Sequence, residues 1–291
     1  MSYTRGFFAG TVTTLFAVGV YQYAQSPKSI QHQYDQQVSD DVKEQIKRRI
    51  LKYGVPNRGE EAKVFTNHVL SYDQSKKIPI WVAECITKEH AQGNANRKYS
   101  KFMPDSQILS LFSADNQDYL GSGWSRGHMA PAGNNKHDQR AMDDTFYLSN
   151  IVPQDMDNNS GFWNRFEMYC RHLTKRFDSV QIFSGPLVLP TETDEKGQKL
   201  VVYPVIGKNE VAVPTHLYKI ILVETNGTPS AIGCFIVPNQ PIENKYSLTE
   251  FQVSLEEIQR RIGVEFFPKL DGTRLQSLCS VDSCTLTRRQ G

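Results

Sequence analysis

Five runs of residues rich in Val and Ile set the strongest limit on what this chain can fold into, because such runs predict strands of a buried sheet. They lie at residues 78–87, 180–189, 200–206, 216–224 and 231–237, and each is bounded by Pro, Gly or Asn. Helices are predicted at residues 159–177 and 255–262, so strands and helices do not alternate as in a βαβ protein. The expected fold class is α+β, with a central, mostly antiparallel sheet flanked by helices.

Capping residues mark the ends of two helices. Ser254 with Glu257 three residues later predicts a capping box, and Gly263 predicts the end of that helix. An earlier helix is predicted to begin at Asp40 or Asp41. Its apolar residues are Val42, Ile46 and Ile50, and Gly54 is expected to close it. Basic residues at positions 43, 47, 48, 49 and 52 form its other face, which we expect to be solvated rather than bound to phosphate.

The N-terminal segment differs in character from the rest of the chain. No charged residue occurs between Gly6 and Pro27, and the run is flanked by Arg5 and Lys28. It is long enough for a membrane-spanning helix, which needs about 20 apolar residues. A secretory signal would also be apolar, but residues 24–26 (AQS) make a poor cleavage site. We expect an anchor at residues 1–27, a polar linker at 28–40 and one folded domain at 41–291.

Charge and cysteine content exclude several classes of protein. The 33 basic and 31 acidic residues nearly cancel, which is not the balance of a histone-like or repressor-like protein, so any phosphate binding must be local. The five cysteines form no C-x-x-C pair, so a thiolate metal site is not expected. Cys279 and Cys284 are close enough in sequence to pair in an oxidising compartment, but buried free thiols are the favoured interpretation.

Residues 121–167 gather His, Arg, Asn, Asp and Glu between glycines and aromatic residues. A hydrophobic core cannot absorb so many polar groups cheaply, which favours a site. Arg126 and His128 end a short strand-like run, and Asn159 is expected to cap the next helix. Each of these residues alone is more often structural. Along that helix an apolar stripe is expected to face the core, and the basic residues at 171, 172, 175 and 176 are expected to be solvated.

Hydrolysis of a phosphodiester requires a base for the attacking water, a cation for the phosphoryl oxygens and support for the leaving 3′ oxygen. His128, whose unperturbed pKa lies near ~6.5, suits the first role. A hard cation such as Mg²⁺ keeps most of its waters, so the amide oxygen of Asn159 can be a sufficient protein ligand. Glu167 lies two helical turns further on and is expected to hold a metal-bound water rather than the ion.

The motif at residues 125–128 (SRGH), followed by Asn159, Trp163 and Glu167, resembles the signature of the DNA/RNA non-specific nucleases: D-R-G-H, then N-x-x-x-W-x-x-x-E. Residues 54–284 also resemble the mitochondrial exo/endonuclease G branch of that family. The shared segments are SYDQ at 71–74, GSGWSRGHMAPAGNN at 121–135, FYLSNIVPQD at 146–155, NNSGFWNR at 158–165, SGPL at 184–187 and LTEFQVSL at 248–255. The resemblance implies a ββα-metal nuclease fold.

By the same resemblance His128 is the general base, Asn159 the metal ligand and Glu167 the holder of a metal-bound water. Arg126 and Arg97 would contact phosphate and stabilise the transition state. The family implies one hydrated Mg²⁺ or Mn²⁺, DNA and RNA as substrates, and 5′-phosphate products. It further implies a homodimer anchored in the mitochondrial inner membrane through residues 6–27, with the nuclease domain in the intermembrane space.

Two departures from the family pattern bear on activity. Position 125 is Ser where the wider family has Asp, so any carboxylate behind the His must come from elsewhere. The sequence ends shortly after Cys284, whereas the branch commonly continues into a helical C-terminal extension associated with 5′-exonuclease behaviour. We therefore expect endonuclease cleavage and leave exonuclease cleavage open. The alternatives are a catalytically silent relative that binds nucleic acid or a partner protein, and a phosphodiesterase for small molecules, which would need a closed pocket.

Overall fold

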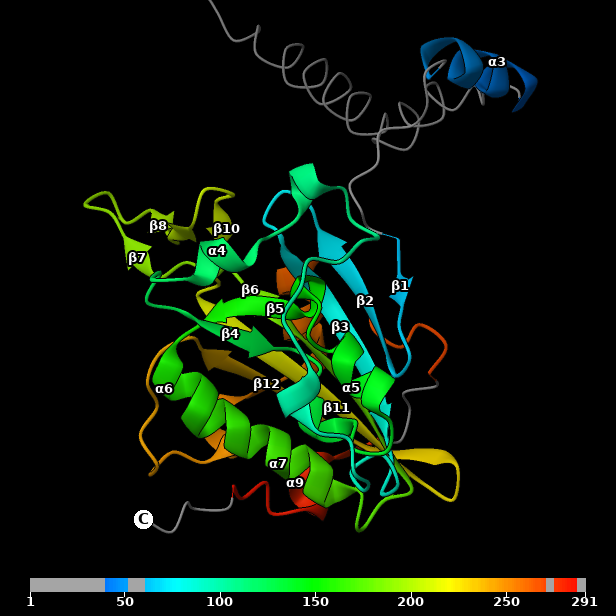
Figure 1. Ribbon diagram of the computed structural model, residues 1–291, viewed down its shortest axis with the longest axis vertical. Coiled ribbons are helices and arrows are strands. Elements are labelled where there is room, and N and C mark those ends of the chain that lie inside the picture. The colour runs from blue at the N-terminus through cyan, green and yellow to red at the C-terminus, as the bar shows by residue number, and fades with distance from the viewer. Residues whose placement is uncertain (1–39, 52–60, 271–274, 287–291) are drawn as a thin grey trace, which may run out of the picture. The chain divides into compact units, whose positions relative to one another are not determined.

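The computed structural model describes residues 40–51, 61–270 and 275–286 (Figure 1). The expected anchor and most of the expected linker, together with Gly54, lie outside the described residues. The chain divides into two units, residues 1–56 and 57–291, and each is described by itself. Within the described ranges, no helix combines the length and apolar character needed to cross a bilayer.

In the first unit the described residues form helix α3 (Asp40–Ile50), which confirms the helix predicted to begin at Asp40 or Asp41. Arg48 and Arg49 on this helix are exposed, as expected of a solvated basic face.

The described part of the second unit is built on an eight-stranded sheet whose path runs β1-β2-β3-β6-β11-β12-β13, with β14 pairing against β12. These strands are β1 (Lys63–Val64), β2 (His68–Asp73), β3 (Ile78–Ile86), β6 (Ser179–Leu187), β11 (His216–Thr225), β12 (Thr228–Pro238), β13 (Gln252–Val253) and β14 (Gln276–Ser277). All pairs along the path are antiparallel, and the β12–β14 pair is parallel. The predicted α+β class and mostly antiparallel sheet are confirmed.

The sheet is buried on both faces, and strand β11 shows why. Leu217 and Ile221 point into the larger core, whereas Tyr218 and Ile220 point into a second core on the opposite face. This alternation follows from the two-residue period of a strand. The larger core lies under α7 (Asn164–Leu173), which crosses the face of the sheet in Figure 1, and the second core contains Ile258 of α8 (Leu255–Ile262).

A ββα unit lies on the first face. Strands β4 (Ser125–His128) and β5 (Ile151–Gln154) pair antiparallel. They are followed by a continuous helix made of α6 (Met156–Asn158), the π-helical segment η5 (Asn159–Trp163) and α7. The expectation that Asn159 caps this helix is wrong. The helix begins earlier, because the Asp155 carboxylate accepts the Asn158 backbone N–H at 2.8 Å, and the regular helix ends at Leu173 instead of residue 177.

The strand predicted at residues 200–206 is also wrong. Only β8 (Lys199–Leu200) and β9 (Val205–Ile206) form there, and they pair with β7 (Glu192–Thr193) and β10 (Val211–Ala212) outside the central sheet. Pro204 interrupts the run, since proline has no N–H to give to a ladder. Val201 and Val202 are half-exposed, so the apolar run is not a core strand.

The helix predicted at residues 255–262 is confirmed as α8, and it ends at Gly263 in the left-handed conformation with φ 74°. Its capping box is only half formed. The Ser254 hydroxyl accepts the Glu257 backbone N–H at 3.0 Å, as expected. The Glu257 carboxylate instead forms ion pairs with Arg260 and Arg261 one turn further on.

Short helices connect these elements. They are η1 (Arg97–Tyr99), η2 (Ser110–Phe112), α4 (Asn116–Tyr119), η3 (Ala132–Asn134), α5 (Gln139–Asp144), η4 (Leu148–Asn150), η6 (Leu248–Phe251) and α9 (Leu278–Val281). Several of them form the rim of the site described below.

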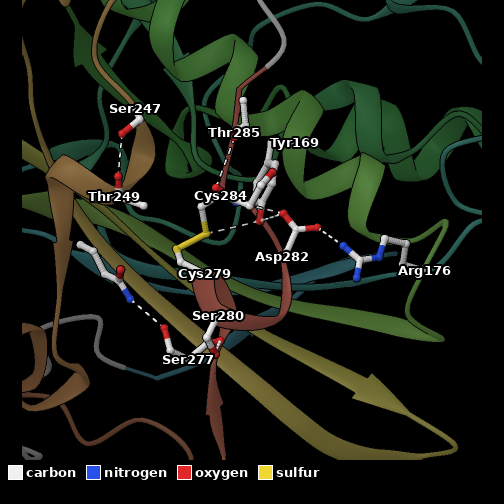
Figure 2. The surroundings of a disulfide bond; sticks show 12 residues. Tyr169, Arg176, Ser247, Thr249, Ser277, Cys279, Ser280, Asp282, Cys284 and Thr285 are labelled. Carbon is white, nitrogen blue, oxygen red and sulfur yellow. Dashed lines mark hydrogen bonds and ion pairs between the residues drawn. A yellow bond between two sulfur atoms is a disulfide. The ribbon is translucent and has the colours of Figure 1, made fainter.

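The C-terminal segment is fixed to the fold by a disulfide between Cys279 and Cys284, which corrects the favoured free-thiol interpretation for this pair (Figure 2). The loop closed by the disulfide carries Asp282, whose carboxylate accepts the Tyr169 hydroxyl at 2.8 Å and pairs with Arg176. Both partners belong to the region of α7, so the loop ties the C-terminal segment to this helix. The remaining thiols are free: Cys170 and Cys234 are buried, and Cys85 is exposed.

Candidate active site

One cleft of about 560 Å³ brings together the five residues predicted to form the site. They come from three segments: Arg97 from η1, Arg126 and His128 from β4, and Asn159 and Glu167 from the helix that follows β5. The cleft is also lined by the polar residues Lys136, Ser160, Asn164 and Arg171. Three arginines and a lysine therefore surround two possible oxygen ligands and one imidazole.

A second hollow, of about 570 Å³, lies on β3, β6 and the end of α8. Its charged side chains already have partners: Asp73 pairs with Lys76 at 2.8 Å, and Arg261 pairs with Glu257 at 2.7 Å. This hollow therefore offers less free charge to a ligand than the cleft around His128.

The ring of His128 is held between two aromatic side chains, with centroid distances of 5.3 Å to Phe102 and 4.8 Å to Phe146. Its Nε2 atom is buried and has no partner among the described residues. Burial lowers the pKa of His128 to about 3, and the positive charge of Arg97 acts in the same direction. This corrects the expectation of an unperturbed imidazole, and the ring is neutral at pH 7.

Asn159 presents its amide oxygen to the cleft because Ser125 occupies the amide nitrogen. The Ser125 hydroxyl donates its single hydrogen to the Gln154 carbonyl at 2.7 Å, so it can only accept from Asn159 Nδ2, which lies 2.9 Å away. Asn159 Oδ1 has no hydrogen bond within the described part of the chain and is left for a ligand. The serine that replaces the family's aspartate thus orients the amide.

The donor set fits a hydrated hard cation. Such an ion takes oxygen ligands and keeps several waters, and the cleft supplies the Asn159 amide oxygen together with the Glu167 carboxylate. Among the described residues, no group of three or more His, Cys, Asp or Glu side chains could enclose a metal. The residues therefore suit Mg²⁺ or Mn²⁺ with a mostly aqueous shell better than a structural zinc site.

Glu167 is a partly buried carboxyl whose proton is held more tightly than it would be in water. Burial raises the pKa of Glu167 to about 7, while the positive charges of Lys219, Arg171 and Arg97 lower it. Since the opposing charges are all cations, a bound metal ion would add to them and favour the carboxylate.

Two arginines approach the cleft over aromatic rings. The Arg126 guanidinium lies over Phe102 and Tyr119 and donates from Nη2 to the Asn116 carbonyl at 2.9 Å. Arg97 lies 5.9 Å from the centre of the Phe146 ring. Ring faces attract cations without neutralising them, so both arginines keep their full charge for an anion.

Arg171 is a site residue that the sequence analysis missed. It was expected on a solvated face, but it is half-buried in the cleft wall and donates from Nη1 to Asn134 Oδ1 at 2.9 Å. Its position one turn after Glu167 on the same helix face is the signal that would have found it. The solvated interpretation is correct for His172 and Lys175, which are exposed.

The fold and the cleft define an α+β protein whose ββα unit carries a cationic site with a neutral imidazole. The sequence model of the DNA/RNA non-specific endonuclease family matches residues 46–273. The chain belongs to this family of nucleases.

Individual relatives support this assignment. The human protein named mitochondrial nuclease EXOG is 56% identical over 239 residues, which are 81% of this chain and 65% of the relative. The mouse protein of the same name is 49% identical over 98% of this chain and 78% of its own length. Human mitochondrial endonuclease G is 39% identical over 76% of this chain and 74% of that protein. The chain thus spans slightly less than two thirds of the human EXOG relative.

A solved structure is similar as well. The crystal structure of EndoG in complex with EndoGI matches with a TM-score of 0.72 and 38% identity. The match covers 79% of this chain and 94% of that one. It supports the ββα nuclease architecture described above.

Proposed function

We propose that this protein is a Mg²⁺-dependent, sugar-non-specific nuclease that hydrolyses phosphodiester bonds of DNA and RNA to leave 5′-phosphate ends. The observation that carries the proposal is the cleft itself, in which the neutral ring of His128 and the free amide oxygen of Asn159 share one cationic hollow. Membership of a nuclease family and the names of the relatives point the same way.

In this proposal His128 Nδ1 takes the proton of the attacking water, which a neutral imidazole can do. Arg97, Arg126 and Arg171 neutralise the phosphoryl oxygens, whose negative charge grows in the transition state. Asn159 Oδ1 would hold the ion, and Glu167 would hold a water bound to it. The ion, when bound, supplies positive charge for the phosphoryl oxygens and the leaving 3′ oxygen.

The pKa of His128 in the free protein, about 3, is lower than is ideal for a base at neutral pH. A bound phosphate brings negative charge beside the ring and raises that pKa, because it opposes the effect of Arg97. Substrate binding would therefore strengthen the base where it is needed.

Substrate breadth follows from the kind of contact that the cleft offers. Arginines and a lysine bind the phosphate backbone, which is common to DNA and RNA and carries no sequence information. We propose endonuclease cleavage as the main mode and 5′-exonuclease cleavage as an additional one. Incubation of circular and end-labelled linear DNA with Mg²⁺ tests this, since only an endonuclease opens the circles.

The test of the chemistry is the substitution His128→Ala. It removes the base without emptying the main core, so the cleavage rate should fall by about 10² to 10⁴ while the melting temperature stays near that of wild type. Retained cleavage would contradict the proposal. A wild-type protein that binds DNA without cutting it would instead support the silent-relative alternative.

Location and assembly complete the proposal. We infer a mitochondrial protein, because the EXOG relatives and endonuclease G carry that word in their names. We further propose an inner-membrane anchor at residues 6–27, with the nuclease domain in the intermembrane space, and a homodimer. Carbonate extraction of purified mitochondria tests the anchor, and light scattering after size-exclusion chromatography tests the dimer.

A further inference from the structure

A buried carboxylate lies behind the cleft and has no part in the chemistry proposed above. Glu84, on strand β3, is only 6% exposed. Its Oε1 atom accepts the side-chain N–H of Asn134 at 2.9 Å, and its Oε2 atom is buried without a partner among the described residues. A carboxylate in this setting costs stability. Packing alone therefore does not explain why a carboxylate lies at this position.

The hydrogen bond from Asn134 continues toward the cleft. Asn134 is 1% exposed and ends the short helix η3. Because its amide nitrogen donates to Glu84, its amide oxygen must face the other way, where it accepts Arg171 Nη1 at 2.9 Å. A single amide thus connects a buried carboxylate on the sheet to a guanidinium in the wall of the cleft.

The residue beside Asn134 shapes the place where the guanidinium lies. A Cβ atom added to Gly133 would be 3.0 Å from Arg171 Nη1 and 3.2 Å from its Cζ. Arg171 therefore lies directly against backbone that has no side chain. The arginine is held on one side by the Asn134 amide and on another by the surface of Gly133.

A second buried charge completes the surroundings. Lys219, on β11, is 1% exposed, and its Nζ atom donates to Ser184 Oγ at 2.6 Å and lies 4.6 Å from the Trp163 ring centre. Its positive charge acts on both Glu84 and Glu167. The sheet thus places Glu84 and Lys219 beneath α7, the helix that carries Glu167 and Arg171.

We propose that Glu84 is a positioning residue for the reaction: through Asn134 it holds the Arg171 guanidinium so that its remaining N–H groups point at a phosphate in the cleft. The proposal rests on the proposed function. Arginine loses rotamer freedom when it is fixed, so a guanidinium held before substrate arrives contributes more to binding and to the transition state than a free one.

A double-mutant cycle tests this role. Single-turnover cleavage of a linear duplex in Mg²⁺ is measured for wild type, Glu84→Gln, Arg171→Ala and the double variant. Glu84→Gln should lower kcat/KM about tenfold in the wild-type background, and less than about twofold when Arg171 is already alanine. If the rate of Arg171→Ala is too low to measure, the cycle is run with Arg171→Lys.

A second substitution reaches the same guanidinium without changing any charge. Gly133→Ala should push Arg171 aside and lower kcat/KM to a similar extent, again only while Arg171 is present. The control is Glu224→Gln, which removes a carboxylate bonded to Ser179 at 2.6 Å on the same sheet and should leave the rate unchanged. Melting temperatures establish that each variant is folded.

The outcomes separate this inference from the proposed function. If Glu84→Gln cleaves at the wild-type rate, or loses the same factor with and without Arg171, the positioning role is wrong although the nuclease assignment stands. If wild type does not cleave nucleic acid, or His128→Ala cleaves as well as wild type, the proposed function itself fails.

Discussion

Asn159 depends on a neighbour for the direction in which it offers its oxygen. The Ser125 hydroxyl accepts from the amide nitrogen at 2.9 Å and thereby leaves the oxygen to the cleft. An amide is a weak single ligand for a hard cation, so affinity depends on its being correctly turned before the ion arrives. The proposed metal dependence of cleavage should therefore respond to both residues.

Asn159→Ala should raise the Mg²⁺ concentration needed for half-maximal cleavage by about tenfold or more, because the direct oxygen ligand is lost. Asn159→Asp keeps an oxygen at this place and serves as the matched control. Ser125→Ala should produce a smaller shift in the same direction. A Mg²⁺ titration that is unchanged in Asn159→Ala would move the ligand to another residue.

The proposed positioning residue should also reveal itself in stability. Burial raises the pKa of Glu84 to about 7, above its ordinary value of 4.5. A carboxyl with a raised folded pKa contributes its full stability below pH 4.5 and loses it as pH rises through 7. Glu84→Gln should therefore melt at a higher temperature than wild type at pH 8, by an amount equivalent to about 1 to 3 kcal/mol.

At pH 5 the two proteins should melt at nearly the same temperature, since wild-type Glu84 is then protonated in the folded state. Thermal denaturation across pH 5 to 8 measures the difference. A variant that is more stable yet slower would separate a functional role of the carboxylate from a structural one. A constant difference across this range would contradict the assigned pKa shift.

Among the elements, the helix from Met156 to Leu173 carries the largest share of the site, and the C-terminal loop supports it. Asp282 on that loop binds both Tyr169 and Arg176 (Figure 2). The Cys279–Cys284 disulfide closes the loop that contains Asp282. Breaking the disulfide should therefore affect the helix as well as the loop itself.

Cys284→Ser should lower the free energy of unfolding by about 2 kcal/mol, because the disulfide no longer restricts the conformational entropy of the unfolded chain across this short loop. Its melting temperature should no longer depend on reductant, whereas that of wild type should fall when dithiothreitol is added. Cys234→Ser provides the control, because that thiol is buried but unpaired. If the wild-type melting curve is the same with and without dithiothreitol, the prediction that this disulfide stabilises the fold is wrong.

The elements also show what the sequence could and could not predict. The branched runs at residues 78–87, 180–189, 216–224 and 231–237 predicted four strands of the sheet correctly, because local composition reflects burial on both faces. The run at 200–206 has the same composition but lies outside the core. The polar motif identified four cleft residues, and the family resemblance added Arg97. The motif could not identify Arg171 as one, because a basic residue on a helix surface is usually solvated.

The role of Glu84 could not be predicted either, for a different reason. It lies inside a predicted strand, and no local pattern distinguishes a carboxylate facing solvent from one facing a buried amide 50 residues away. Only the pairing of β3 with its neighbours and the packing of η3 against the sheet bring the two together. Such contacts are set by the tertiary structure, and no short segment of the sequence shows which distant residues will meet.

Across the whole molecule, the positive charge available to a nucleic acid is concentrated in one cleft and is not reflected in the net charge. The net formal charge is only +2, yet Arg97, Arg126, Arg171 and Lys136 all line one cleft. A nearly neutral protein has weak long-range attraction for nucleic acid, so binding should depend on these few contacts.

Duplex affinity should fall with salt, with a slope of log K against log salt of about −0.9 for each phosphate contact. Arg171→Ala should reduce the magnitude of this slope by about one. Fluorescence anisotropy with labelled duplex over a range of KCl, in Ca²⁺ to prevent cleavage, measures it. Arg260→Ala is the control, since Arg260 is paired with Glu257 on α8. An unchanged slope in Arg171→Ala would remove Arg171 from the phosphate contacts.

The ββα unit and Arg171 occupy one uninterrupted stretch from residue 125 to residue 171. Four of the five residues predicted for the site come from this stretch, Arg97 comes from η1, and strand β3 beneath supplies Glu84. A short continuous segment therefore carries most of the predicted site, and changes of chain length outside it should leave these side chains in place if they spare Arg97, Glu84 and the disulfide loop.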